Sequence, residues 1–259
     1  MNNCKPVNSP MLNDDGALGS DVEDLKAHES RLYRGATALL SYLSQDRPDL
    51  SAAVTHLAKG MSKPTNHDFE KLRRAVRFVK GCPRLVQLMV WQPEVECIEL
   101  FTDSDWANCK NTRKSHSGGC IFMNQHLISH WCRIQPSIAY SSGEAELFSG
   151  NVGLSRSIGH WNTLRELRGN TWGNLRHHVD ASACKAILMR KGSGSIKHLE
   201  VKDLWAQKVI RDKGISVVKI PRELNVADAL ASYSNHTDLF KQVTRMGFDV
   251  REEEAKSTT

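Results

Sequence analysis

The sequence predicts an α/β protein in which a mixed five-stranded sheet with helices on both faces is preceded by a small helical subdomain. Residues 31–81 carry apolar side chains at helical spacing. Residues 85–132 then carry short apolar runs at close spacing, which favours an antiparallel meander. From residue 143 onward helical and strand-like segments alternate, and that alternation predicts a mixed rather than a purely antiparallel sheet.

The first helical region, residues 31–81, should contain three helices. Pro48 separates the first from the second because proline disfavours helix in the residue before it. Thr65 or Asn66 can cap the third helix, and Gly81 can end it. One face of this third helix is basic and carries Arg73, Arg77 and Lys80. The stripe can bind a phosphate backbone or can be an ordinary solvated surface.

Elements and domains follow from the same patterns. Strands are expected near residues 85–91, 97–102, 118–123, 127–132, 174–179 and 215–220. Helices are expected near residues 143–167, 181–190 and 197–211, with a last one from about residue 226. The predicted domains are a disordered leader (1–30), a helical segment (31–92), the sheet domain (93–245) and a polar tail (246–259).

Charge is distributed unevenly along the chain. The formal net charge is +6, but residues 1–30 and 246–259 are acidic, so the middle of the chain is more basic than the whole. A basic body suits a polyanionic partner such as nucleic acid, although a soluble basic surface would have the same composition.

The composition also excludes several classes. No apolar run approaches the ~20 residues that a membrane helix needs, and the polar N-terminus does not resemble a signal peptide. The seven cysteines show no C-x-x-C pair, so neither a zinc site nor a disulfide framework is expected. These features favour a reducing compartment, cytoplasmic or nuclear, and no membrane partner.

Four carboxylates stand in settings suited to divalent-metal chemistry: Asp103, Glu146, Asp180 and Asp228. Asp103 and Asp180 follow strand-like runs, whereas the other two stand at or near predicted helix starts. Clustered carboxylates repel one another unless a cation neutralises them, and hard cations such as Mg²⁺ prefer oxygen ligands. Two such ions can activate a water and stabilise a leaving oxygen, so the set suggests a nuclease.

An ordered series of motifs carries a resemblance to a known family. The series is Thr102-Asp103-Ser104-Asp105-Trp106-Ala107, Arg113-Lys114-Ser115-x-Ser117-Gly118, Ser141-Ser142-x-Glu144-Ala145-Glu146, Lys197-His198 and Asn225-x-Ala227-Asp228. It closely resembles the ribonuclease H domain of copia-type (Pseudoviridae) retrotransposon Pol polyproteins. Upstream, Arg47-Pro48-Asp49 and Val79-Lys80-Gly81 look like the reverse-transcriptase thumb and connection segment of the same polyprotein.

The resemblance implies a ribonuclease H-like fold with strand order 3-2-1-4-5. It implies hydrolysis of the RNA strand of an RNA–DNA hybrid with two Mg²⁺ or Mn²⁺ ions. Asp103, Glu146, Asp180 and Asp228 match the family's metal-binding acids. Glu146 is preferred to Glu144 because its helix face continues through small residues, and the two acids lie about 200° apart around a helix. The rest of a retrotransposon polyprotein is a further expected partner.

Other candidate nucleic-acid contacts have a structural alternative. Arg113 and Lys114 can grip phosphate or belong to a solvated loop. His198 can contact phosphate or serve only to build the fold.

Two departures from the family pattern are compatible with metal binding, although the second can alter the C-terminal helix that holds Asp228. Leu147 stands where an aromatic residue is usual, and Ala231-Ser232-Tyr233 replaces the usual Thr-Lys-Pro after the last acid. No reverse-transcriptase metal hairpin is found around Asp14-Asp15, so no polymerase activity is expected from this fragment.

Three functions compete for this sequence. The first is a metal-dependent ribonuclease H. The second is a catalytically decayed or domesticated nucleic-acid-binding module of the same fold. The third, a transposase or integrase, is disfavoured by the fourth acid and by the upstream helices.

Overall fold

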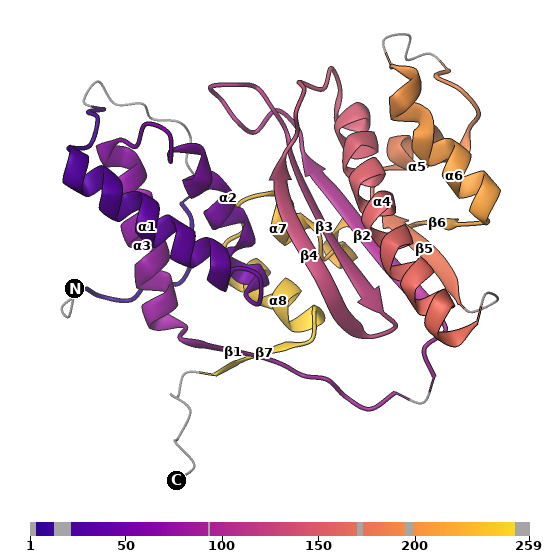
Figure 1. Cartoon of the computed structure of the whole chain (residues 1–259), viewed down its shortest axis with the longest axis horizontal. Helices are drawn as coiled ribbons and strands as arrows, with labels where there is room; N and C mark the ends of the chain where they lie inside the picture. The colour runs from indigo at the N-terminus through magenta and orange to yellow at the C-terminus, as the bar shows by residue number, and fades with distance from the viewer. Residues whose placement is uncertain (1–3, 13–21, 93, 170–172, 195–198, 252–259) are drawn as a thin grey trace. The chain divides into compact units, whose positions relative to one another are not determined.

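The structure is a computed structural model that describes residues 4–12, 22–92, 94–169, 173–194 and 199–251 of the chain. Contacts divide the chain into unit 1, residues 1–88 and 233–259, and unit 2, residues 89–232. Figure 1 shows the elements of both units. The sequence placed boundaries at residues 92/93 and 245/246, and it did not predict that residues 233–259 group with the helical unit.

Unit 1 is mainly helical. It contains α1 (Ala27–Leu43), the 3-10 helix η1 (Pro48–Leu50), α2 (Ser51–Lys59), α3 (Asn66–Gly81), β1 (Arg84–Gln87), α8 (His236–Arg245) and β7 (Phe248–Arg251). The three helices predicted within residues 31–81 are present. The strand predicted at residues 85–91 ends at Gln87 and pairs antiparallel with β7, which the sequence did not predict.

The helix predicted from about residue 226 is divided in two. The first part is α7 (Asp228–Ala231), which belongs to unit 2. It ends because Ser232 adopts an extended backbone, with φ −135° and ψ 174°. Asn235 then begins α8, since its side chain accepts a hydrogen bond from the backbone N–H of Asp238.

Unit 2 is built on a five-stranded mixed sheet with the order β4-β3-β2-β5-β6. The strands are β2 (Cys97–Asp105), β3 (His116–Met123), β4 (His126–Ile134), β5 (Asn174–Val179) and β6 (Ser216–Lys219). The central strand β2 pairs antiparallel with β3 and parallel with β5. Numbered within unit 2, this is the order 3-2-1-4-5, so the predicted ribonuclease H-like fold is confirmed.

The helices of unit 2 are α4 (Ser142–Arg168), α5 (Ser182–Met189), the 3-10 helices η2 (Val201–Leu204) and η3 (Arg222–Leu224), α6 (Trp205–Lys213) and α7. The helix predicted at residues 197–211 therefore begins later, and its residues 197–198 lie outside the described part of the chain. No helix within the described residues has the length and apolar composition that crossing a bilayer requires.

Helices cover both faces of the sheet. On one face α4 approaches β2 so closely that a Cβ at Gly153 would lie 2.6 Å from Cγ2 of Thr102. Side chains alternate along a strand, so Asp103 and its register partner Gly118 face the opposite side. There a Cβ at Gly118 would lie 2.6 Å from the backbone nitrogen of Ala231 in α7. These two glycines let both helices pack at backbone distance from the central strands.

The hydrophobic core of unit 2 lies between α4 and the sheet. Ile98 and Leu100 of β2 and Leu147 and Leu154 of α4 are fully buried in it. This packing fixes the position of α4 along β2. The first turns of α4 are thereby held beside the end of the central strand.

Candidate active site

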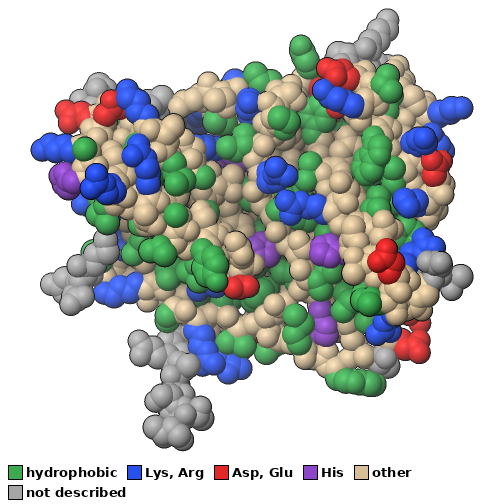
Figure 2. Space-filling model, viewed as in Figure 1, with side chains coloured by type: hydrophobic (Ala, Val, Ile, Leu, Met, Phe, Trp, Pro, Cys, Tyr) green, Lys and Arg blue, Asp and Glu red, His purple; other side chains and the backbone are tan. Residues whose placement is uncertain are grey.

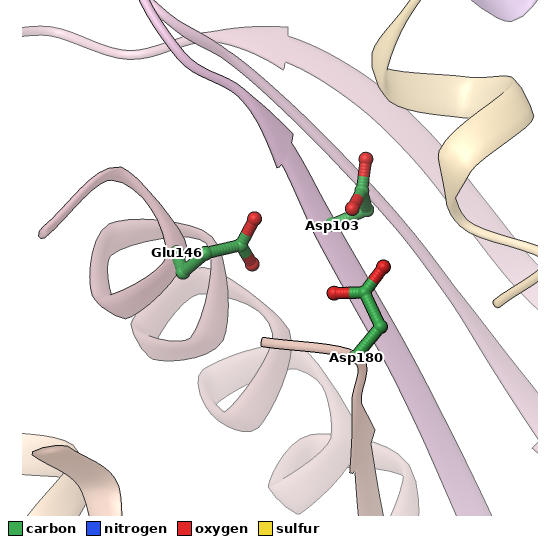
Figure 3. Close-up of side chains that lie close together, drawn as sticks. All are labelled: Asp103, Glu146 and Asp180. Atoms are coloured by element: carbon green, nitrogen blue, oxygen red, sulfur yellow. The ribbon is translucent and has the colours of Figure 1, made fainter. Parts of the chain in front are cut away.

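Three carboxylates from separate elements converge at one end of the sheet of unit 2. Asp103 lies near the end of β2, Asp180 directly follows β5, and Glu146 lies in the second turn of α4. Each offers one oxygen, and the three oxygens lie within 4.8 Å of one another. Figure 3 shows the three side chains turned toward a common point.

The parallel pairing of β2 and β5 explains the meeting of the two aspartates. In the register of these strands Phe101 lies opposite His178. Asp103 and Asp180 each follow two residues later, so both reach the same end of the sheet. The convergence is therefore a direct consequence of strand register.

Glu146 is held in place by hydrogen bonds from β2. The backbone N–H and the hydroxyl of Ser104 donate to Oε1 of Glu146 over 3.1 Å and 2.9 Å. The second oxygen, Oε2, is buried and has no hydrogen-bond partner among the described residues. Glu144 points elsewhere, because its carboxylate accepts a hydrogen bond from the backbone N–H of Tyr140 over 2.7 Å. The structure thus brings Glu146, and not Glu144, into the group.

Asp228 lies close to this group but is not one of the three acids whose oxygens meet. The side chain of Asn225 donates to the backbone carbonyl of Thr102 over 3.1 Å, which ties the start of α7 to β2. Asp228 forms an ion pair with Arg222, whose Nη2 lies 3.1 Å from Oδ1. Its charge still reaches Asp103, because it contributes to raising the pKa of that carboxyl.

Burial and mutual repulsion shift the proton affinity of the acids. Burial raises the pKa of Asp103 well above its usual range, and the charges of Glu146, Asp228 and Asp180 raise it further. Burial, with the charge of Asp180, raises the pKa of Glu146 to about 8, although the hydrogen bonds from Ser104 oppose this shift. Without a cation the site therefore retains protons near neutral pH.

A buried histidine supports the site from the α4 face of the sheet. Nε2 of His177 lies 2.8 Å from the hydroxyl of Thr102, the residue before Asp103. Burial lowers the pKa of His177 to about 3, so the ring is neutral. A Cβ at Gly150 would lie 3.2 Å from this ring, so α4 confines it.

Two of the predicted phosphate contacts in unit 2 lie in a loop that follows Asp103 in the sequence. Arg113 and Lys114 belong to the loop between β2 and β3, and Arg113 is exposed with a φ of 56°. The backbone N–H of Arg113 bonds to the carbonyl of Cys109, which makes this a tight turn. His198 lies outside the described residues.

The basic stripe of α3 in unit 1 already has partners within its own unit. Arg77 donates from Nε to the carbonyl of Lys5 over 2.6 Å, and Lys80 lies 3.3 Å from the carbonyl of Cys4. Arg73 pairs with Glu70 over 2.6 Å. The sequence led us to expect little fixed structure in residues 1–30, whereas residues 4–12 lie along this helix because its cations bind their carbonyl groups.

Sequence reasoning missed four supporting residues of the site: Ser104, Arg222, Asn225 and His177. Ser104 and Asn225 stand in the same sequence motifs as Asp103 and Asp228. Their polar side chains next to a predicted metal ligand were the available signal. The sequence around Arg222 offers no comparable signal, since its role depends on where η3 places it.

Comparisons with known proteins identify relatives of part of the chain. No family model matches. An uncharacterized mitochondrial protein of Arabidopsis thaliana is 36% identical over 146 residues, which is 56% of this chain and 59% of that protein. The retrovirus-related Pol polyprotein from transposon RE1 of the same plant is 31% identical over 143 residues, 55% of this chain and 10% of the polyprotein.

A third relative spans nearly the whole chain. The retrovirus-related Pol polyprotein from transposon TNT 1-94 of Nicotiana tabacum is 24% identical over 256 residues. The match covers 95% of this chain and 19% of the polyprotein. The chain therefore spans only a part of each of these relatives.

Two solved structures show partial similarity. The N-terminal ribonuclease H domain of a Mycobacterium tuberculosis protein, fused to maltose binding protein, has 14% identity and a TM-score of 0.36, over 58% of this chain and 97% of that chain. LC11-RNase H1 in complex with an RNA/DNA hybrid has 17% identity and a TM-score of 0.35, over 51% of this chain and 92% of that chain. The fold assignment rests on the strand order of unit 2 and not on these scores.

Proposed function

We propose that unit 2 is a metal-dependent endonuclease that hydrolyses the RNA strand of RNA–DNA hybrids, since relatives of this chain include retrovirus-related Pol polyproteins of transposons. The observation that carries the proposal is the convergence of Asp103, Glu146 and Asp180 within 4.8 Å. Three buried or half-buried acids held this close are costly to ionise without a cation. The fold class supports a nuclease-type domain.

The residues fit a hard divalent cation. All three groups are carboxylates, the ligands that Mg²⁺ and Mn²⁺ prefer. Oε2 of Glu146 is buried without a hydrogen-bond partner among the described residues, and a cation would supply the missing interaction. Asp103, Glu146 and Asp180 would hold the metal, and Asp228 is the fourth acid expected to complete a site for two ions.

The chemistry divides between the ions and the chain. Divalent ions held by these acids would supply activation of a water for attack on the scissile phosphorus and stabilisation of the departing 3′ oxygen. Asp103 and Asp180 keep their positions because the strands β2 and β5 fix them. Ser104 orients Glu146, leaving one oxygen free to bind. Burial raises the pKa of Asp103 and of Glu146, and the charge of Arg222 opposes this rise and so favours the ionised forms that bind metal.

The hybrid is the substrate that the family resemblance implies. Only the RNA strand carries 2′-hydroxyl groups, which act as both donors and acceptors and allow a protein to distinguish RNA from DNA. The positive charge of the chain suits a polyanion.

The direct test compares labelled RNA–DNA hybrid, duplex DNA and duplex RNA with the purified full chain in Mg²⁺ or Mn²⁺. We expect cleavage of the RNA strand of the hybrid alone and none in EDTA. Binding of the hybrid without cleavage by folded protein would contradict the proposal and favour the nucleic-acid-binding module. Cleavage of duplex DNA would favour a transposase-like activity.

A further inference from the structure

A cluster of basic side chains lies where a side chain of α4 reaches the edge strand β4. Arg156 of α4 lies over the ring of Trp131, with 4.8 Å from its guanidinium carbon to the ring centroid. Arg133 follows Trp131 by two residues on β4, so both side chains project from the same face of the sheet. His160 lies one turn after Arg156 on α4. We call Arg133, Arg156 and His160 the α4–β4 cluster.

Nothing described in the structure neutralises this cluster. Among the residues that the structure describes, no carboxylate forms an ion pair with either arginine. Burial, and then the charge of Arg133, lowers the pKa of Arg156. Burial, and then the charge of Arg156, lowers the pKa of His160. The guanidinium groups of Arg133 and Arg156 repel one another, and an anion bound between them would relieve that repulsion.

The stacking on Trp131 restrains Arg156 before any ligand arrives. The ring of Trp131 in turn lies against the backbone of β3, where a Cβ at Gly119 would fall 2.1 Å from the ring. A guanidinium held against an aromatic face loses less conformational freedom when it binds a phosphate. Figure 2 shows Lys and Arg side chains on the face over β4 and α4, without an Asp or Glu side chain directly beside them.

Strand register relates the cluster to the acids. Arg133 lies opposite Ser117 on β3, and Ser117 lies opposite Ser104 on β2. Ser104 donates to Glu146, so Arg133 stands at the far end of a row that begins beside the acids. Two strand spacings of ~4.8 Å separate the ends of this row by about 10 Å. The two ends of the row therefore lie on one face of the sheet, separated by one intervening strand.

We propose that Arg133 and Arg156 form a phosphate-binding subsite that holds the backbone of the hybrid to one side of the cleaved position. The inference rests on the proposed function, since it assigns the subsite to that substrate. Arg133 supplies an exposed guanidinium and Arg156 a partly buried, stacked one. Guanidinium groups bind phosphate oxygens in a bidentate manner, so the pair can fix the register of the strand.

The alternative is that Arg156 only covers the ring of Trp131. This alternative predicts a change in stability but none in nucleic-acid binding when Arg156 is replaced. It also gives no role to Arg133, which is exposed. Affinity for the hybrid therefore distinguishes the two possibilities.

The test measures binding of labelled hybrid to the full chain in EDTA over a range of salt concentrations. Arg133→Gln and Arg156→Gln should each weaken binding about ten-fold, the low end for hydrogen bonds to a charged group. Each should also reduce the slope of log affinity against log salt by about one. Arg165→Gln is the matched control, because Arg165 lies on the same helix, 5.1 Å from the ring centroid of Trp161.

Unchanged affinity and salt slope in Arg133→Gln and Arg156→Gln would overturn the subsite. Arg133→Gln keeps this outcome decisive even if Arg156→Gln unfolds, because the side chain of Arg133 is exposed. In Mg²⁺ the variants should raise KM for hybrid cleavage and leave kcat unchanged. A third outcome is that the arginine substitutions weaken hybrid binding although the wild-type chain never cleaves RNA. That outcome would support the subsite and refute the proposed activity.

Discussion

Asp103→Asn should abolish hybrid cleavage and at the same time stabilise the metal-free protein. The amide has nearly the same shape but cannot carry the negative charge that a divalent ion needs. We expect a loss of at least about 10³-fold in kcat, as for removal of a catalytic group. The stability gain follows because burial and three neighbouring carboxylates oppose ionisation of Asp103. Hybrid cleavage in Mg²⁺ and urea unfolding in EDTA at pH 8 check both parts.

Asp105→Asn is the matched control for this substitution. Asp105 lies two residues along the same strand and is half-buried, but it pairs with Asn108 and does not join the three acids. It should retain most of the activity. Equal losses in both variants, or an Asp103→Asn protein that is both active and less stable, would show that the acids have been assigned wrongly.

The metal-free protein should lose stability as the pH rises from 5 to 9. The pKa of Glu146 is raised from 4.5 to about 8, so the native state holds this proton more tightly than the unfolded chain. The resulting stabilisation is present in full below pH 4.5 and disappears as the pH rises to 8. A shift of this size corresponds to roughly 2–4 kcal/mol after allowance for relaxation of the site.

Urea unfolding in EDTA across this pH range measures the effect. Glu146→Gln should flatten the profile, because the glutamine cannot ionise. Glu166→Gln on the same helix is the control, since Glu166 is exposed and should leave the profile unchanged. Millimolar Mg²⁺ should restore stability chiefly at high pH, where the ligands are deprotonated. A wild-type profile that stays level or rises between pH 5 and 8 would contradict a buried, proton-retaining carboxylate.

The sequence could predict most of the strands and the helix that carry the acids because these depend on local patterns, whereas the strand order and the meeting of the acids were expected from the family resemblance. Alternation of apolar residues identified β2, and Asp103 stands where that pattern ends. The choice of Glu146 followed from helical geometry and from the small residues Gly150 and Gly153, both of which the structure places against β5 or β2 residues.

Other features depend on contacts that no local pattern records. The carbonyl of Lys5 bonds to Arg77, 72 residues away, and Asn225 reaches Thr102, 123 residues away. The pairing of β1 with β7 joins strands from opposite ends of the chain. The division of the last predicted helix depends on the extended backbone at Ser232, which a helical pattern across residues 226–245 conceals.

A calorimetric titration of the full chain with Mn²⁺ at pH 8 tests most directly whether Asp103, Glu146 and Asp180 hold metal. We expect binding of two ions to the wild-type protein, and loss of at least one of them in Asp103→Asn while Asp105→Asn binds as the wild type does. A folded wild-type protein that binds no Mn²⁺, or an Asp103→Asn variant that binds it equally well, would contradict a metal site at Asp103, Glu146 and Asp180.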